Sequence, residues 1–493
     1  MTSSRVSGGD RYGTSAAISR AAFPDPTSVS RVFLVAGASF ADGLAAGPAA
    51  AATGGAVLMT HRAALTPTAA TEIRRIAPKE IVIVGGVGVV SSEVERQARA
   101  LAPTVTRVSG DDRYETSRRI VERFFPGAEP TVYLATGRDF PDALSGGALA
   151  ARTGAPVLLV DGVKQSVDNS TRQALERLSA DKVVAFGGTG VVSSKLLASA
   201  SAATSASAAR LGGSNRYETS TRIEAAVAGN GEVLMVTGLD FPDALSAIQL
   251  AAVRNAPIVL TVPYCIGGST IPAVSSATRL TLIGGPGAVR GLVGSRPTCL
   301  PTRTATSPWV MVNKKTALRP PSYVPADLRT VGGTSERMRA EAATALERMI
   351  AAAKNEGAGR IKPGSGYRSY TTQTYLYNNA VASKGKTRAE LGTARPGHSE
   401  HQTGWTMDVV ACTSSYCSGI DDFGGSPQGR WTVKNAHRFG FIVRYEPGYT
   451  SITGYASEPW HLRYVGVPLA TDYKKGGFHT LEEYLVYPAA PAY

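Results

Sequence analysis

The sequence lacks the features that would place the chain in a membrane. No run of apolar residues approaches the roughly 18 needed to cross a bilayer, so we expect no transmembrane segment. The opening Met-Thr-Ser-Ser-Arg has no apolar core of the kind found in a signal peptide. If the protein is exported, as other features below suggest, its signal peptide is not present in this chain.

Cysteine is scarce, with only four in 493 residues: Cys265, Cys299, Cys412 and Cys417. They form two pairs that are close in sequence, and this even count suits two disulfides in an oxidising compartment. Metal binding by these thiols is disfavoured because Cys412 and Cys417 have no matching second pair at zinc-ribbon spacing. Two pairs of free thiols are the remaining alternative.

Signatures of nucleic-acid binding are also missing. The chain carries 52 basic and 38 acidic residues, a net charge of +14 that is shared by both halves of the sequence. Such basicity suits an anionic polymer as partner. However, there is no basic stripe interleaved with aromatic residues, no zinc-finger spacing and no RNA-binding signature. We therefore expect no nucleic-acid partner.

One motif occurs three times in the first 300 residues. The segment Arg-Val-Ser-Gly-Gly-Asp-Arg-Tyr-Gly-Thr-Ser that begins at Arg5 returns with few changes at Arg107 and Arg210, at offsets of 102 and 103 residues. Two further signals recur in the same order, a Phe-x-Asp-x-Leu sequence and a Gly-Gly pair. Three markers kept in order at one period predict three copies of one structural unit.

Each copy alternates strand and helix patterns. Short β-branched runs such as 32–35 and 81–84 end in glycine and precede segments rich in Ala, Leu and charge. This alternation predicts an α/β unit with a parallel sheet covered on both faces. A nucleotide site is disfavoured, because Gly85-Gly-Val-Gly88 lacks the third glycine of the fingerprint and no Gly-Lys-Ser/Thr follows.

Two polar features recur with the repeats, an aspartate and an Arg-Tyr pair. They can cap helices and close salt-bridged turns, or they can contact a ligand, and the sequence leaves both interpretations open. The residues are Asp42, Asp142 and Asp243, with Arg11–Tyr12, Arg113–Tyr114 and Arg216–Tyr217.

The first 290 residues or so resemble three tandem type-2 cell-wall-binding repeats, known from surface proteins of Gram-positive bacteria. The resemblance implies a Toprim-like α/β fold in each repeat, a pseudo-threefold trio, and non-covalent attachment to an anionic secondary wall polymer. We expect repeats at 1–104, 105–207 and 208–293, a Pro- and Thr-rich linker at 294–310, and a second domain at 311–493.

The second domain is predicted to be α+β. Residues 336–353 place apolar side chains at helical spacing, which indicates a first helix with Met338 and Met349 in the core. The periodicity then dissolves into short aromatic and Gly-rich segments.

The second domain concentrates histidine, since it holds four of the six in one window: His398, His401, His437 and His461. His401 and Asp408 lie in a Ser-x-His-x-x-Gly-x-x-x-Asp pattern, and His461 lies in Glu-Pro-Trp-His. Two nitrogen ligands and one carboxylate would leave the fourth position of a tetrahedral zinc ion open for water, as catalytic sites do. The alternative is two hydrogen-bonded core histidines and an acid in a turn.

Three further residues suit chemistry beside such a metal. Glu458 is the candidate general base, and Pro459 keeps it out of helical geometry, so the site must be assembled from loops and strand ends. Arg368, in a Gly-rich turn before a helix, can bind a carboxylate or stabilise an oxyanion, or can form a helix-end salt bridge. His398 is either a loop residue or a residue beside the metal ligands, and His437 suggests a structural role at a helix end.

From about 311 to 467 the chain resembles the VanY-type D-alanyl-D-alanine carboxypeptidases, within the group of lysostaphin-like and D-Ala-D-Ala metallopeptidases. The resemblance implies zinc held by His401, Asp408 and His461. It also implies Glu458 as the base, Arg368 facing substrate, and Ser399 and Gln373 lining the pocket. One departure is Trp405-Thr406 after the motif glycine, where the family usually has a small aliphatic pair. We expect this bulk to reshape the pocket.

These expectations combine into one function. We expect a secreted, cell-wall-associated zinc metallopeptidase that hydrolyses the terminal D-Ala-D-Ala bond of peptidoglycan stem peptides. The alternatives are an endopeptidase or L,D-carboxypeptidase on the same scaffold, or a non-catalytic wall-binding surface protein. The intact set of His401, Asp408, Glu458 and His461 argues against the last.

Overall fold

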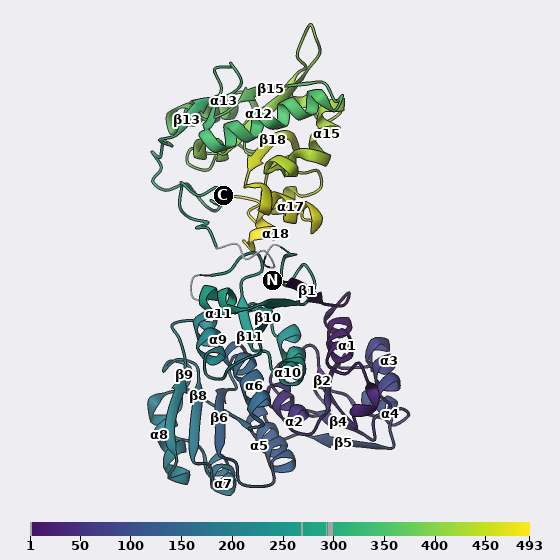
Figure 1. Cartoon of the computed structure of the whole chain (residues 1–493). Helices are drawn as coiled ribbons and strands as arrows, with labels where there is room; N and C mark the ends of the chain where they lie inside the picture. Colours follow the sequence, from purple (N-terminus) through teal and green to yellow (C-terminus); the bar gives the residue numbers. More distant parts are fainter. Residues whose placement is uncertain (1, 268–269, 292, 294–298) are drawn as a thin grey trace. The chain divides into compact units, whose positions relative to one another are not determined.

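The structure is a computed structural model that describes residues 2–267, 270–291, 293 and 299–493. The chain divides into two compact units, Met1–Thr298 and Cys299–Tyr493. Figure 1 shows both units, and each is described by itself. Among the described residues, no helix combines the length and the apolar character that crossing a lipid bilayer requires.

The first unit contains three parallel four-stranded sheets, as the repeats predict (Figure 1). The sheet orders are β3-β2-β4-β5, β7-β6-β8-β9 and β1-β12-β10-β11. The strands are β1 (Thr2–Val6), β2 (Arg31–Ala36), β3 (Ala56–Thr60), β4 (Glu80–Val84), β5 (Thr104–Val108), β6 (Thr131–Thr136), β7 (Val157–Val160), β8 (Lys182–Phe186), β9 (Ser207–Leu211), β10 (Glu232–Thr237), β11 (Ile258–Thr261) and β12 (Arg279–Ile283).

Helices connect these strands in each repeat. They are α1 (Arg11–Ala22), α2 (Ala46–Ala52), α3 (Pro67–Ile76), α4 (Ser92–Ala98), α5 (Arg113–Phe124), α6 (Pro141–Thr153), α7 (Asn169–Leu178), α8 (Ser194–Thr204), α9 (Arg216–Glu224), α10 (Pro242–Arg254) and α11 (Ile271–Ser276), with short 3-10 helices η1 (Pro26–Ser28) and η2 (Gly43–Ala45).

One edge strand of each sheet comes from the segment that opens the next copy of the motif. Strand β5 completes the first sheet beside β4, and β9 completes the second beside β8. The third sheet is completed by β1, which pairs in parallel with β12 from Thr2↔Arg279 to Val6↔Ile283. The predicted limits at 104/105 and 207/208 therefore fall within shared strands, and the chain closes the third sheet with its first strand.

The recurring motif fixes these sheets to their helices. The motif acid or amide caps the N-terminus of α1, α5 or α9, through Asp10, Asp112 and Asn215. The motif serine accepts a hydrogen bond from an edge strand at Met59, Leu159 or Leu260, at distances between 2.9 and 3.1 Å. Most of the repeated motif is therefore explained by backbone hydrogen bonds.

The repeated aspartates do not act as the helix caps that one interpretation of the sequence suggests. Phe140 and Phe241, not the aspartates, occupy the N-cap positions of α6 and α10, and Asp42 makes no side-chain cap bond at η2. Helices α6 and α10 begin one residue before their aspartates, and in all three repeats the carboxyl lies beside a glycine that follows a strand. A Cβ on Gly85 would come within 2.8 Å of Asp42 Oδ2.

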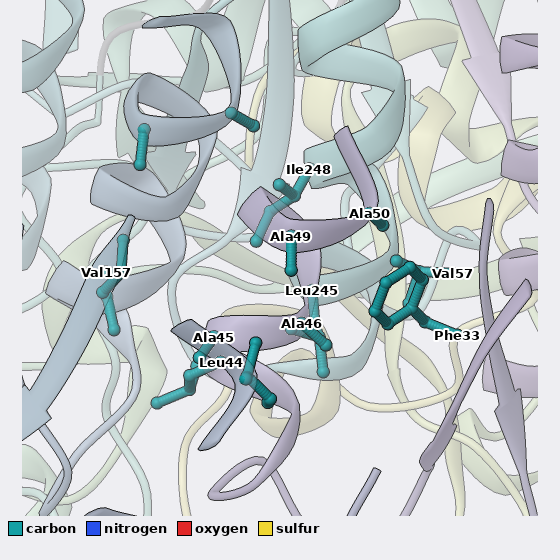
Figure 2. Close-up of a cluster of buried hydrophobic side chains, with 14 of the residues drawn as sticks. Phe33, Leu44, Ala45, Ala46, Ala49, Ala50, Val57, Val157, Leu245 and Ile248 are labelled. Atoms are coloured by element: carbon teal, nitrogen blue, oxygen red, sulfur yellow. The ribbon is translucent and has the colours of Figure 1, made fainter. Parts of the chain in front are cut away.

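The repeats meet through one helix each, α2, α6 and α10, which contact one another. Figure 2 shows Leu245 and Ile248 of α10 packed beside Ala46 and Ala49 of α2. The approach depends on small residues, since a Cβ on Gly47 would lie 2.7 Å from Cγ2 of Ile248. This contact joins the three repeats in one hydrophobic core.

Phenylalanine rings and arginine guanidinium groups repeat this threefold contact at the Phe-x-Asp sequences. The rings of Phe40, Phe140 and Phe241 lie 5.6 to 6.0 Å apart, centroid to centroid. The motif arginine of one repeat lies over the phenylalanine of another, at 5.7 to 5.9 Å: Arg11 over Phe241, Arg113 over Phe40 and Arg216 over Phe140. The arginine of each Arg-Tyr pair thus contacts a neighbouring repeat.

The second unit is α+β, with an antiparallel sheet in the order β15-β16-β18-β17 and a separate hairpin β13-β14. Its elements are β13 (Leu328–Thr330), β14 (Arg337–Arg339), α12 (Ala340–Asn355), β15 (Arg360–Ser365), α13 (Tyr370–Lys384), α14 (Lys386–Ala389), η5 (Glu400–Thr403), β16 (Thr406–Cys412), η6 (Ile420–Asp422), α15 (Pro427–Asn435), η7 (Ala436–Phe439), β17 (Phe441–Tyr445), α16 (Thr450–Thr453), β18 (Glu458–Tyr464), α17 (Val467–Lys475) and α18 (Leu481–Leu485).

The first helix of this unit starts later than its periodicity predicts. Arg337–Arg339 forms strand β14, paired with β13, and α12 begins at Ala340. Cross-strand pairing outweighs helical spacing there, although Met338 and Met349 are buried in the core as expected.

The predicted linker lies partly in the second unit. Its residues 294–298 are outside the described part of the chain, and Cys299 begins the second unit. Trp309 is 5% exposed and donates to the carbonyl of Val465 at 3.0 Å.

One predicted disulfide is present, between Cys412 at the end of β16 and Cys417. No described cysteine is free. The pairing of Cys265 with Cys299 stays a prediction.

Candidate active site

The sheet of the second unit brings three predicted metal ligands together. Asp408 in β16 lies directly opposite His461 in the antiparallel neighbour β18, so both side chains project from the same face. His401 belongs to the 3-10 helix η5, which ends at Gly404 with a φ of +74° and turns the chain into β16. The sequence predicts a site made of loops and strand ends, but Asp408 and His461 lie within β16 and β18, and His401 lies in a 3-10 helix.

The three side chains form a buried group that can hold a metal ion. One ligand atom from each of His401, Asp408 and His461 lies within 4.8 Å of the others. Nε2 of His401 lies 3.2 Å from Oδ2 of Asp408, and Nδ1 of His461 lies 3.3 Å from Oδ1. Oδ1 of Asp408 is buried without a hydrogen bond, an arrangement that a cation would satisfy. Two imidazole nitrogens and one carboxylate suit zinc.

Burial and charge act against each other at these ligands. Burial opposes charge on Asp408, but His401 and His461 outweigh it and hold the pKa of this carboxyl well below its usual range. Burial lowers the pKa of His401, assisted by the Arg368 cation. Burial also opposes charge on His461, yet contacts with three carboxylates raise its pKa well above the ordinary value. The carboxylates of the site therefore favour a cation among them.

Glu458 stands beside the ligands at the start of β18. Its Oε2 lies 3.4 Å from Nδ1 of His461, and its side chain is only 14% exposed. Burial raises the pKa of Glu458 above its ordinary range, against the lowering effect of His461. A carboxylate with a raised pKa is suited to take up a proton and return it.

Arg368 contacts Oδ2 of Asp408, the oxygen that also faces His401. Its Nη2 donates to Oδ2 of Asp408 at 2.6 Å, and its Nε donates to the Ser365 hydroxyl at 3.0 Å. It therefore forms an ion pair with a metal ligand, an arrangement that the sequence does not predict. Ser369 caps the N-terminus of the following helix α13, and the Arg368 side chain reaches Asp408 instead.

A cavity of about 220 Å³ opens over these residues. All seven predicted site residues line it: Arg368, Gln373, Ser399, His401, Asp408, Glu458 and His461. Gln373 is buried and donates to the carbonyl of Ala394, another residue of the cavity wall, at 2.7 Å. Three aromatic residues that the sequence did not point to, Tyr445, Tyr455 and Trp460, also line it.

Other candidates lie away from this cavity. His398 donates from Nδ1 to the carbonyl of Asn313 at 2.8 Å if that nitrogen carries the proton, and it packs against Tyr493. His437 lies in η7, in another small cavity. The expectation that Trp405 reshapes the pocket is wrong, because its ring turns into the core and stacks on Tyr464.

A group of buried charges that contacts His461 is not predicted by the sequence. Glu400, Arg444, Arg463 and Glu482 form ion pairs and their side chains have no exposed surface. Glu400 lies inside the motif that contains His401, yet charged residues in a sequence are ordinarily expected at the surface. Only their burial in the structure identifies them.

Known families match both units of the chain. The model of the VanY D-alanyl-D-alanine carboxypeptidase family matches residues 335–467. The model of cell wall binding domain 2 matches 5–95, 107–197 and 210–293. The two matched regions correspond to the peptidase-like unit and to the three repeats.

Individual relatives agree with these matches. A D-alanyl-D-alanine carboxypeptidase of Enterococcus faecalis is 35% identical over 36% of this chain and 65% of its own length. The bifunctional D-Ala-D-Ala dipeptidase and carboxypeptidase VanXYC of Enterococcus gallinarum is 33% identical over 31% of this chain and 79% of its own length. Cwp8 from Clostridium difficile aligns with a TM-score of 0.53 and 27% identity, over 58% of this chain and 50% of that chain.

The chain thus spans less than two thirds of the Enterococcus faecalis relative and half of Cwp8. Within those limits the matches and the geometry agree, because the His401–Asp408–His461 group lies inside the matched stretch 335–467. The chain therefore belongs to the VanY family of D-alanyl-D-alanine carboxypeptidases, and it carries three cell wall binding domain 2 repeats before the domain of that family.

Proposed function

We propose that this chain is a zinc-dependent D,D-carboxypeptidase that removes the terminal D-Ala from peptidoglycan stem peptides, held at the cell wall by its repeats. The observation that carries the proposal is the convergence of His401, Asp408 and His461 with Glu458 in one cavity. A zinc ion at these ligands would polarise the scissile carbonyl and lower the pKa of a water molecule.

Glu458 is the proposed general base. Its carboxylate lies on the cavity wall beside a ligand but is not one of the three residues that converge on a common point. It can therefore accept a proton from the attacking water and deliver it to the leaving amine. The raised pKa favours the first of these steps, because a more basic carboxylate accepts a proton more readily.

Arg368 is proposed to face the substrate from the other side of the cavity. Its guanidinium is the cation on a wall that otherwise carries Asp408, Glu458 and Glu400. A guanidinium can stabilise negative charge that develops at the scissile carbonyl, or bind the free carboxylate of the peptide. Ser399 and Gln373 complete the proposed substrate wall. Related proteins named for D-Ala-D-Ala activity support this substrate class.

The repeats are proposed to attach the enzyme to an anionic wall polymer. Their family is named for cell wall binding, the chain is structurally similar to Cwp8, and it carries a net charge of +14. Attraction between a basic protein and a polyanion weakens with salt. Binding to isolated walls should therefore fall as salt is added, and a secreted location follows from this proposal.

The test is mass spectrometry of muropeptides incubated with the zinc-loaded protein. We expect pentapeptide stems to lose one D-Ala while tetrapeptides and cross-links stay intact. His401→Ala should abolish this product. The control is His437→Ala, which changes a half-buried histidine outside this cavity and should leave the product unchanged. Loss of the fourth residue would indicate L,D-carboxypeptidase activity, opened cross-links would indicate an endopeptidase, and no change would indicate a non-catalytic surface protein.

A further inference from the structure

A buried carboxylate, that of Glu400, lies next to His461 on the wall of the same cavity. Oε2 of Glu400 lies 3.4 Å from Nε2 of His461. Oε1 of the same carboxylate lies 2.9 Å from Nε of Arg444 and 2.9 Å from Nη1 of Arg463. Glu400 and both arginine side chains have no exposed surface.

The two ring nitrogens of His461 therefore have different neighbours. Nδ1 faces Asp408 at 3.3 Å and Glu458 at 3.4 Å, whereas Nε2 faces Glu400 at 3.4 Å. A histidine that binds a metal uses the lone pair of one nitrogen and carries its proton on the other, which is usually held by a hydrogen bond. We propose that Glu400 is a positioning residue that holds Nε2–H of His461 and so directs Nδ1 to the metal.

His401 shows the same arrangement with the nitrogens reversed. Its Nδ1 lies 2.8 Å from the carbonyl of Gly366, and its Nε2 faces Asp408 at 3.2 Å. One ligand is thus oriented by a neutral carbonyl and the other by a charged carboxylate. The carboxylate is the stronger acceptor, but it needs compensating charge because it is buried.

Arg444 and Arg463 supply that compensation, and Glu482 balances it. Two terminal nitrogens of Arg444 donate to the Glu482 carboxylate at 2.9 and 2.7 Å. Glu482 lies in α18, outside the stretch 335–467 that matches the VanY family, and accepts from Asn313 Nδ2 at 3.1 Å. Within the described part of the chain, Glu482 forms an ion pair with Arg444 and none with His461. It is therefore a matched buried partner of Arg444 that can serve as control.

This inference rests on the proposed metal site and is tested by zinc affinity. Glu400→Gln keeps the shape of the side chain but replaces the carboxylate, and Glu482→Gln makes the same change at the other partner of Arg444. We expect zinc, competed with a chelator, to bind Glu400→Gln about 10 to 100 times more weakly than the unchanged protein. Glu482→Gln should stay within about threefold, even where both changes lower the melting temperature of the metal-free protein.

Equal losses of zinc affinity in the two variants, or none in Glu400→Gln, would overturn the proposal. If Glu400→Gln does not fold, nitrogen-15 NMR of the histidines in the unchanged zinc-loaded protein decides instead. We expect His461 to bind through Nδ1 and to keep a slowly exchanging proton on Nε2. Ligation through Nε2 would contradict the role of Glu400. Turnover of a D-Ala-D-Ala pentapeptide is measured on the same sample, and its absence with normal zinc affinity contradicts only the proposed function.

Discussion

Arg368 donates a hydrogen bond to Asp408 at 2.6 Å, so the arginine proposed to face the substrate also contacts a proposed metal ligand. The two roles predict different effects of Arg368→Gln. If substrate charge is its main partner, kcat/KM should fall by about 10²–10³-fold while zinc affinity is retained. If it chiefly holds Asp408, zinc affinity should fall with activity. We expect the first result, measured by steady-state kinetics and chelator competition on one preparation.

Phe241 lies at the contact between the three repeats, with Phe40, Phe140 and Arg11 around its ring. Phe241→Ala should destabilise the first unit by about 3 kcal/mol, because a nearly buried ring is removed from a shared core. The nearby Leu239 is 48% exposed, so Leu239→Ala should change little. Thermal unfolding of the two variants measures the difference, and equal melting temperatures would show that the aromatic contact contributes nothing.

Asp243 makes the stability of the first unit depend on pH. Burial, reinforced by the charge of Asp240 and opposed by Arg11, raises the pKa of Asp243 to about 6. Because the folded pKa is raised, the neutral carboxyl favours folding below about pH 4, and this contribution is lost as the pH rises through about 6. Asp243→Asn should therefore stabilise the protein by about 2–3 kcal/mol at pH 7.5 and hardly at all at pH 4.

The control for this effect is Asp181→Asn, which removes an exposed carboxylate from the same unit. Denaturant unfolding at the two pH values gives both differences. A stabilisation by Asp243→Asn that is the same at pH 4 and pH 7.5 would mean that burial does not disfavour its charged form.

The disulfide between Cys412 and Cys417 closes a small loop after the strand that carries Asp408. Replacing both cysteines with serine should cost about 2 kcal/mol, since so short a loop loses little entropy on closure. Zinc affinity should be unchanged, because Asp408 is held by its neighbours in β15 and β18 rather than by the loop. A large loss of zinc in the double variant would assign the disulfide a role in the site.

Sequence patterns predict the parts of this molecule that depend on local residues. His401, Asp408 and His461 are identifiable because a metal requires particular side chains at compatible spacing, and the strand-helix alternation of the repeats gives their sheets. The pairing of β1 with β12 cannot be predicted from local sequence, because a short strand at the start of the first repeat can pair with the sheet of that repeat or with the sheet of another. Tertiary pairing also decides that Arg337–Arg339 forms a strand instead of the first helical turn.

Buried charges are the other part that the sequence does not reveal. Arg444 lies in a β-strand and has no exposed surface, but nothing in its neighbours along the chain indicates that two glutamates will meet it. Likewise, the bulk of Trp405 can be read from the sequence, whereas its direction into the core depends on Tyr464 in β18. Such partners are distant in sequence, so their contacts require the fold.

The central claim is that Glu458 acts as the base beside a zinc ion held by His401, Asp408 and His461. The most direct measurement is turnover of a pentapeptide ending in D-Ala-D-Ala by the zinc-loaded Glu458→Gln protein. The substitution keeps the size of the side chain but removes the proton acceptor, so turnover should fall by about 10²–10⁴-fold while zinc content stays near one per chain. A folded, zinc-replete Glu458→Gln protein with unchanged turnover would contradict the account.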